Sequence, residues 1–303
     1  MNFAPIIIFC YNRPIHLKAL IDSLLLNSLA KESHLFIFSD GFKGKSDFSD
    51  VMLVRDVIKN IEGFKKITIV ERSYNFGLGN SVIDGVSRVF EEYDNVIVLE
   101  DDLLVSSDFL QFMNEGLLFY ENESRIFCVS GFNFKFQLPK TYLDEVYVLP
   151  RICSYGWGTW KDRWSKVDWS MEYFPQFIED KSQREMYEKG GEDLTLILLK
   201  QYLGYYESWA IRWDYNRFLS NAYCVYPVFP KVINRGADGS GTNDSIFIRN
   251  NRILSSNTVS FQSNVREVED ILFGARSFFK LSLIKKVYFK YLLFKYYFKK
   301  CRV

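Results

Sequence analysis

The stretch Asn95–Asp102, NVIVLEDD, decides the predicted fold of this 303-residue chain. Its apolar run is typical of a strand that is buried on both faces of a sheet. Comparable runs occur at residues 5–10 (PIIIFC), 35–38 (LFIF), 66–71 (KITIVE) and 126–130 (IFCVS). The segments between these strands have helical patterns. Because strands and helices alternate strictly, we predict an α/β fold with a mostly parallel sheet that is flanked by helices.

Four helices are expected between the strands, at residues 14–28, 50–61, 79–92 and 106–120. Pro14 suits the first turn of the first helix, where the missing N–H of proline costs little. Ser106 and Ser107 are expected to cap the fourth helix.

The composition changes after residue 132, where Trp, Tyr and Gly become frequent. This second part is predicted to hold helices at 183–203 and 206–220 and short strands at 223–225 and 231–234. Because no linker separates the two parts, we expect a single domain with two lobes. The first lobe would comprise residues 1–132, and the second, with α+β structure, residues 133–270. A basic helical tail would follow over residues 271–303.

The charges are divided unequally along the chain. The net charge is +1, but residues 271–303 hold nine Lys and Arg and no acidic residue, which leaves −8 for residues 1–270. Lysines alternate with Tyr and Phe around the expected tail helix, without a clean apolar stripe. This pattern favours an anionic membrane surface as partner. Packing on the acidic body or self-association is the alternative, and the acidic body argues against nucleic acid.

The counts of histidine and cysteine exclude several classes of site. His16 and His34 are the two histidines, and neither is expected near the acids that could do chemistry. The five cysteines have no metal-ligand or redox spacing, which favours reduced thiols in a cytoplasmic protein. A metal would therefore be held by oxygen ligands, which favours Mn²⁺ or Mg²⁺. Neither a signal peptide nor a transmembrane helix is predicted.

Acidic residues follow the strand at 95–99 directly, as Glu100, Asp101 and Asp102. In parallel sheets, ligands bind beyond the carboxyl ends of the strands. Three adjacent carboxylates repel one another there, and a divalent cation that bridges to a phosphate would offset this repulsion. A solvated turn is the alternative interpretation.

Other strand ends also have polar residues that suit a nucleotide. Asp40 follows the strand at 35–38 and could accept hydrogen bonds from a base or a ribose, although an Asp-Gly turn explains it equally well. Tyr11 and Arg13 follow the first strand, and Arg13 could bind phosphate beside a helix N-terminus. Gly77 and Gly79 lack the spacing of a dinucleotide-binding loop, which argues against an NAD site.

Three further segments of the second lobe suggest sugar chemistry. The tryptophans of residues 157–164 could stack on sugar rings or form a buried cluster. Glu207 precedes Trp209 at an expected helix start, where it could act as a general base in a partly dry, tryptophan-lined pocket or merely face the helix dipole. Residues 238–241 (DGSG) could form a loop that closes over a ligand.

Taken in order, these segments resemble the GT-A-fold glycosyltransferases that use nucleotide sugars. They are most similar to the N-acetylglucosaminyltransferase I family and its bacterial relatives. The resemblance covers residues 4–245 and rests on the order of Tyr11–Pro14, Ser39–Asp40, Val98–Leu103, Asp108–Phe109, Cys128–Ser130, Gly156–Gly158 and Glu207–Trp209.

The resemblance implies a GT-A fold whose first lobe binds a UDP-sugar and whose second lobe binds the acceptor. Asp102 would be the direct ligand of Mn²⁺ or Mg²⁺, and Glu100 and Asp101 would support the ribose and the hydrated metal. Asp40 would bind the uracil. Tyr11 and Arg13 would complete the donor site, with Arg13 at the phosphates.

The resemblance also implies an inverting transfer in which Glu207 deprotonates the acceptor hydroxyl, with Asp214 as a substitute base. The sugar would be GlcNAc or GalNAc, and the acceptor a glycan or a lipid-linked glycan of a bacterial surface polysaccharide. The enzyme would be cytoplasmic and attached to the inner face of the membrane through its tail. A non-catalytic carbohydrate-binding or scaffold protein and a sugar-phosphate nucleotidyltransferase are the alternatives.

Overall fold

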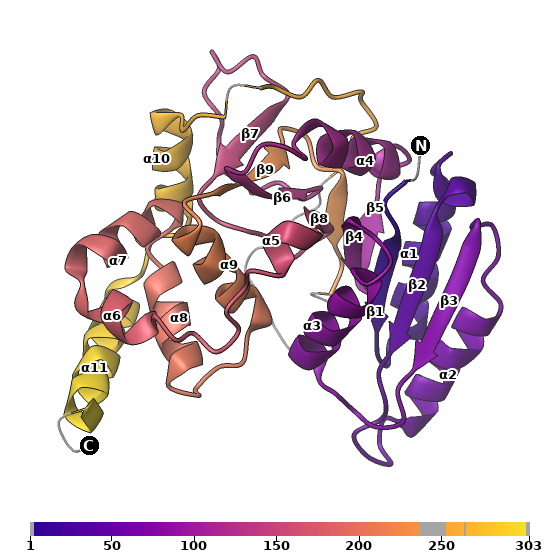
Figure 1. Ribbon diagram of the computed structural model, residues 1–303, viewed down its shortest axis with the longest axis horizontal. Helices are drawn as coiled ribbons and strands as arrows, with labels where there is room; N and C mark the ends of the chain where they lie inside the picture. The colour runs from indigo at the N-terminus through magenta and orange to yellow at the C-terminus, as the bar shows by residue number, and fades with distance from the viewer. Residues whose placement is uncertain (1–2, 237–252, 264, 301–303) are drawn as a thin grey trace.

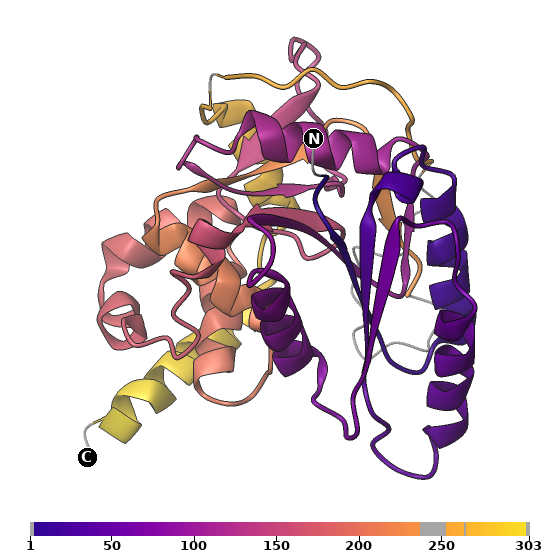
Figure 2. The same ribbon diagram turned by 45° about the vertical axis from the view of Figure 1, so that its right-hand side comes forward.

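The computed structural model describes residues 3–236, 253–263 and 265–300, without the side chains of residues 299 and 300. An eight-stranded sheet crosses the molecule in the order β3-β2-β1-β4-β8-β6-β9-β7 (Figure 1, and turned by 45° in Figure 2). Its strands are β1 (Ile6–Cys10), β2 (His34–Ser39), β3 (Lys66–Glu71), β4 (Asn95–Glu100), β6 (Ile126–Ser130), β7 (Val146–Leu149), β8 (Trp157–Trp160) and β9 (Tyr223–Pro227). A separate two-stranded ladder joins β5 (Leu103–Val105) to β10 (Val232–Asn234).

Strands β3, β2, β1 and β4 are all parallel neighbours, so their carboxyl ends lie at one edge of the sheet. The helices between them are α1 (Pro14–Leu25), α2 (Phe48–Lys59) and α3 (Leu78–Val89). The predicted α/β fold with a mostly parallel, helix-flanked sheet is therefore confirmed. Strand β8 was not predicted, and it lies antiparallel between β4 and β6.

The continuous apolar run of β1 is buried on both faces of the sheet, as the sequence predicts. Successive strand residues point to opposite faces, so Ile6 and Ile8 join one hydrophobic core and Ile7 and Phe9 join the other. Helices α1, α2 and α4 (Phe109–Phe119) cover the first face. Helices α3, α9 (Trp209–Leu219) and α10 (Glu269–Phe278) cover the second.

A third apolar cluster lies outside the sheet, at the left of Figure 1. It is built by α6 (Phe174–Glu179), α7 (Lys181–Tyr187), α8 (Leu194–Tyr202), the outer side of α9 and α11 (Leu283–Lys300). The tail helix thus packs on the body through part of its surface. None of the helices in the described residues is long and apolar enough to cross a membrane.

Two expectations about the helices were wrong. The predicted helix at 183–203 is interrupted, because Gly190 approaches the Pro150 carbonyl too closely for a side chain and Gly191 adopts a φ of +146°. Helix α4 begins after Asp108, and neither Ser106 nor Ser107 caps it. The Ser106 hydroxyl instead donates to the Asp108 carboxylate at 2.6 Å, and the Ser107 hydroxyl bonds that of Ser256.

The tryptophan segment is part of the core, which favours the buried-cluster alternative over stacking on sugar rings. Trp157 is 1% exposed and Trp160 is 2% exposed, because β8 lies in the middle of a sheet that is covered on both faces. Trp157 packs against Trp213 of α9, with their ring centroids 4.2 Å apart. The buried-cluster interpretation of this segment is therefore confirmed.

Candidate active site

The three consecutive acids lie where β4 leaves the sheet, at the carboxyl edge of the parallel strands. The Asp101 amide donates to the Phe9 carbonyl and extends the pairing with β1 by one residue. The Asp101 carboxylate accepts a hydrogen bond from the Tyr11 amide at 3.2 Å. Asp102 forms an ion pair with Arg13, in which Nη1 and Oδ2 are 3.1 Å apart. The structure thus brings Tyr11, Arg13, Asp101 and Asp102 together at one place. We call these four residues and Glu100 the acidic edge.

The pKa values at the acidic edge are raised. Loss of solvation and then the charge of Asp102 raise the pKa of Asp101 to about 7. The same two causes, followed by the charge of Asp101, raise the pKa of Glu100 well above its ordinary value. Desolvation also raises the pKa of Asp102, although Arg13, Asn234 and His16 act against it. Because burial is the first cause of each rise, the ionised forms of these acids are disfavoured in the chain alone, and an added cation would stabilise them.

Asn234 and His16 are partners of Asp102 that the sequence reasoning missed. The ladder between β5 and β10 pairs Asn234 with Leu103, and the Asn234 side-chain amide donates to Asp102 at 3.2 Å. His16 lies one turn after Arg13 on α1, and its charge lowers the pKa of Asp102. The expectation that His16 lies far from the acids was wrong, because the first turn of α1 starts at the same sheet edge.

The chain that follows β10 covers Asp102. The Arg235 amide donates to the Asp102 carbonyl at 2.8 Å. Gly236 lies so close to the Asp102 carboxylate that a Cβ atom at this position would collide with it. A larger residue at position 236 would therefore have to displace the Asp102 carboxylate. The expected closing loop at 238–241 lies outside the described residues.

Asp40 lies at the same edge, buried beneath the loop that follows β3. Its Oδ1 atom accepts hydrogen bonds from the amides of Gly41 (2.9 Å) and Phe76 (2.8 Å), and its Oδ2 atom accepts one from Gly77 (3.0 Å). These bonds join the end of β2 to the start of α3. The glycine at position 77 is the sequence signal for this contact. Gly77 adopts a φ of +73°, a conformation that favours glycine.

Glu207 is exposed, and the expectation of a partly dry pocket was wrong. It precedes Ser208, the N-cap of α9, whose hydroxyl accepts a hydrogen bond from the Ile211 amide at 3.3 Å. The Glu207 carboxylate adjoins the first turn of α3, where a Cβ atom built on Gly79 would be 3.5 Å from its Oε1 atom. Asp40 and Glu207 therefore both flank the N-terminus of α3.

Asp214, the substitute base, is a structural residue. It is 2% exposed, and its Oδ1 atom accepts hydrogen bonds from the Arg217 guanidinium (3.0 Å) and the Ile152 amide (2.7 Å). A carboxylate that is enclosed and paired in this way cannot reach an acceptor hydroxyl. The expectation of Asp214 as a base was therefore wrong.

The residues at the acidic edge fit a divalent cation that arrives with a diphosphate. In residues 3–236, 253–263 and 265–300, no three His, Cys, Asp or Glu side chains converge as a ready-made metal cage. Mg²⁺ is commonly held by one or two carboxylates and completed by substrate phosphates. Asp102 can supply such a carboxylate, and its neighbours have the raised pKa values that an added cation would relieve.

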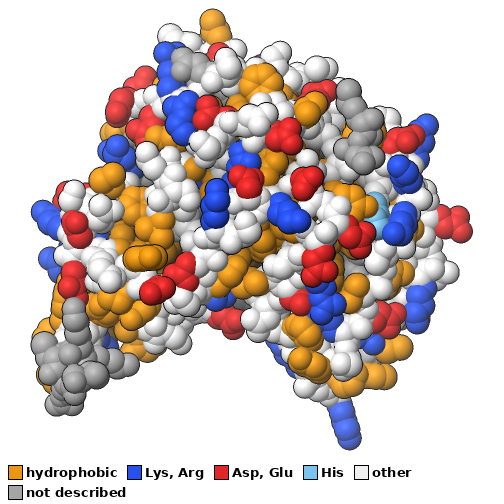
Figure 3. Space-filling view, viewed as in Figure 1, with side chains coloured by type: hydrophobic (Ala, Val, Ile, Leu, Met, Phe, Trp, Pro, Cys, Tyr) orange, Lys and Arg blue, Asp and Glu red, His pale blue; other side chains and the backbone are white. Residues whose placement is uncertain are grey.

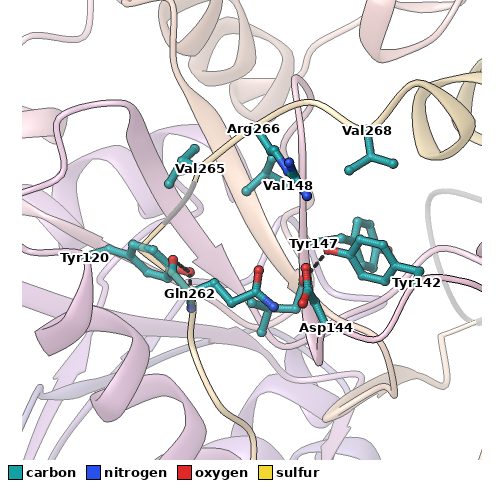
Figure 4. A pocket seen from close by; sticks show the side chains of 10 residues that line it. Tyr120, Tyr142, Asp144, Tyr147, Val148, Gln262, Val265, Arg266 and Val268 are labelled. Carbon is teal, nitrogen blue, oxygen red and sulfur yellow. Dashed lines mark hydrogen bonds between the residues drawn. The ribbon is translucent and has the colours of Figure 1, made fainter.

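A separate pocket lies between β7 and the segment 262–268 (Figure 4). It is lined by Tyr120, Tyr142, Asp144 and Arg266, among others, and contains none of the predicted site residues. The Tyr142 hydroxyl closes one side of the pocket by donating to the Val146 carbonyl at 2.6 Å. This pocket is therefore distinct from the acidic edge.

No protein-family model matches the sequence. Among solved structures, the chain is similar to the mannosyltransferase PcManGT from Pyrobaculum calidifontis in complex with GDP-Man and Mn²⁺, with a TM-score of 0.36 and 10% identity over 53% of this chain. It is also similar to S. aureus TarS, with a TM-score of 0.39 and 13% identity over 75% of this chain. The matched regions span less than half of these proteins, 45% and 36% of their length.

Proposed function

We propose that this protein is an inverting, metal-dependent glycosyltransferase that moves a sugar from a UDP-sugar to a hydroxyl of a glycan acceptor. The observation that supports it most is the acidic edge, where Asp102 pairs with Arg13 beside two acids of raised pKa. The Asp102 carboxylate would bind the cation, and the Arg13 guanidinium would donate hydrogen bonds to the phosphates.

In this proposal, residues 1–132 bind the donor. Asp102 would hold Mn²⁺ or Mg²⁺, which neutralises the charge that develops on the leaving diphosphate. Arg13 donates hydrogen bonds to the phosphates, and Glu100 and Asp101 support the ribose. Tyr11 belongs to the donor site through its backbone bond to Asp101.

The Asp40 carboxylate has more acceptor positions than the three backbone hydrogen bonds described above use. Its Oδ1 atom already accepts two hydrogen bonds, whereas its Oδ2 atom accepts one. A carboxylate has about four acceptor positions. The Oδ2 atom can therefore accept the imide N–H of uracil without releasing the loop at Phe76 and Gly77.

Residues 133–270 would supply the acceptor side and the base. The acceptor oxygen bonds to the anomeric carbon while the bond from that carbon to the diphosphate oxygen breaks, which inverts the centre. Glu207 takes the acceptor proton. Its exposed position beside Gly79 leaves the carboxylate accessible to a large acceptor.

For the remaining specificity, we propose GlcNAc or GalNAc as the sugar and a lipid-linked glycan of a bacterial surface polysaccharide as the acceptor. The enzyme would act in the cytoplasm, peripherally attached to the inner face of the membrane. The nine basic residues of the tail support this placement.

The test is UDP release from a panel of UDP-sugars, with Mn²⁺ and with EDTA. We expect release with Mn²⁺ that EDTA abolishes and that Asp102→Ala removes. Asp22→Ala is the matched control, because Asp22 is an exposed acid that pairs only within α1. Equal activity of Asp102→Ala and the wild type would contradict the metal role. Pyrophosphate exchange with a nucleoside triphosphate would indicate a nucleotidyltransferase, and sugar binding without turnover a carbohydrate-binding protein.

A further inference from the structure

Helix α11 has apolar residues on two faces, and one of these faces packs into the third cluster. The inner face packs into the third cluster through Leu292 (1% exposed) and Tyr296 (6% exposed), with Phe289 and Leu293 partly buried beside them. This packing sets the rotation of the helix about its own axis. Apolar residues thus occupy two sides of the tail helix, which agrees with the expectation of a tail without one clean apolar stripe.

The outer face is largely apolar. Lys295, four residues after Tyr291 and three before Phe298, lies on the same side, with its ammonium group over the Tyr291 ring. One side of the helix has six exposed apolar residues, each of which is three or four residues from another of them: Ile284, Val287, Tyr288, Tyr291, Phe294 and Phe298. Ile284 is 82% exposed and Phe294 is 65% exposed. We call these six residues the outer stripe. Figure 3 shows hydrophobic side chains beside the C-terminal residues at its lower left, where Figure 1 places α11.

We propose that the outer stripe inserts into the surface of an anionic lipid bilayer and attaches the enzyme to it. The proposal deepens the membrane association of the proposed function by naming the surface that makes it. Helices that lie in the membrane interface have a buried apolar face and basic residues on the remaining circumference. Tyrosines suit this depth because the ring is apolar and the hydroxyl stays hydrated.

The charges around the outer stripe select the lipid surface. Lys285 and Lys290 are exposed on α11, and no acidic residue occurs after Asp270. Two lysines are already used by the body, since Lys286 pairs with Glu192 at 2.9 Å and Lys295 donates to the Tyr205 hydroxyl at 3.1 Å. A second copy of the chain docked stripe to stripe would bring two basic helices together, whereas anionic headgroups complement them.

The attachment would also orient the proposed catalytic base. Tyr205 lies two residues before Glu207, so the contact with Lys295 ties the loop of the base to α11. A protein seated on the membrane through α11 would hold this loop near the bilayer, as a lipid-linked acceptor requires. The orientation of the Glu207 loop toward a lipid-linked acceptor rests on the proposed function, whereas the binding of the outer stripe to lipid does not.

The experiment is sedimentation of the full chain with vesicles of phosphatidylcholine alone and of phosphatidylcholine mixed with phosphatidylglycerol. The variant combines Ile284→Ser, Val287→Ser and Phe294→Ser. The matched control combines Leu26→Ser, Leu118→Ser and Leu143→Ser, which change three apolar side chains of comparable exposure elsewhere. We expect the wild type and the control to bind the anionic vesicles and the variant to bind about tenfold more weakly.

Equal vesicle binding by the variant and the control would overturn the proposal, as would failure of the wild type to bind. A wild-type dimer that the variant converts to a monomer, without vesicle binding by either, would assign the outer stripe to a second copy and also overturn it. UDP binding with Mn²⁺ is measured by thermal shift in all three proteins. This measurement tests the proposed transferase independently of lipid binding by the outer stripe. If the variant loses vesicle binding but still binds UDP, the outer stripe binds lipid without contributing to the donor site.

Discussion

The acidic edge and helix α11 concentrate opposite charges in very different surroundings. At the acidic edge, three consecutive carboxyl groups are desolvated, and the pKa values of all three are raised. On α11, Lys285 and Lys290 are exposed and remain hydrated. Like charges that are crowded and desolvated cost free energy until a ligand arrives, whereas hydrated charges cost little. The comparison therefore separates the proposed active site from the proposed lipid-binding surface.

The largest expected effect is the loss of activity in Asp102→Asn. The amide keeps the shape of the side chain but removes the charge that would bind the cation. We expect UDP release with Mn²⁺ to fall about 10³-fold. Steady-state turnover measures this effect, with Asp22→Asn as the control that changes an exposed acid of α1. Activity within a few-fold of the wild type would place the metal elsewhere.

A smaller loss is expected for Glu207→Gln. The amide cannot accept the acceptor proton, so transfer should fall about 10²-fold while the affinity for UDP stays unchanged. Transfer to an acceptor and UDP binding by calorimetry are measured on the same preparation. Glu185→Gln is the matched control, because Glu185 is an exposed residue of α7 that pairs within its own helix. Full transfer by Glu207→Gln would remove this residue from the mechanism.

A pH effect of intermediate size follows from Asp101. Its pKa in the folded chain, about 7, lies above the ordinary value of 3.8, so the folded state binds the proton more tightly than the unfolded state does. The contribution to stability is complete below pH 3.8 and is lost as the pH rises through about 7. The slope is at most about 1.4 kcal/mol per pH unit.

The measurement is urea unfolding between these two pH values, compared between the wild type and Asp101→Asn. We expect the free energy of unfolding to fall more steeply with rising pH in the wild type. Adding Mn²⁺ and UDP should reduce the difference, because they offset the charge of the ionised acids. Parallel curves for the two proteins would show that Asp101 does not titrate in this range.

The smallest effect is expected on α11. Replacing Lys285 and Lys290 by Gln removes two exposed charges, and the free energy of unfolding should change by less than about 0.5 kcal/mol. Vesicle binding should nevertheless weaken and become less sensitive to salt. Urea unfolding and sedimentation at two salt concentrations test both statements. A large loss of stability would mean that these lysines pack on the body.

Local patterns predicted the parallel half of the fold well. The apolar runs at β1, β2, β3 and β4 are long enough to identify strands that are buried on both faces, and their order dictates parallel crossovers. The acids at the end of β4 and Arg13 at the end of β1 follow from the same rule, since carboxyl ends of parallel neighbours meet at one edge. The ion pair between Asp102 and Arg13 is the direct result.

Long-range contacts account for what local patterns left open or missed. Strand β8 returns from later in the chain to enter the sheet between β4 and β6, and this insertion buries Trp157 and Trp160. No local pattern distinguishes a tryptophan that stacks on a ligand from one that is covered by another helix. Asn234 likewise reaches Asp102 only through the ladder between β5 and β10.

The sequence by itself determined the alternating α/β fold, the acids at the edge of the sheet and the separation of an acidic body from a basic tail. These features depend on residue type and on spacing within single elements. Only the tertiary structure decided which aromatic residues are buried and which face of α11 packs on the body. Burial depends on what packs against a side chain, and the packing partners of Trp157 and Leu292 lie far away in the chain.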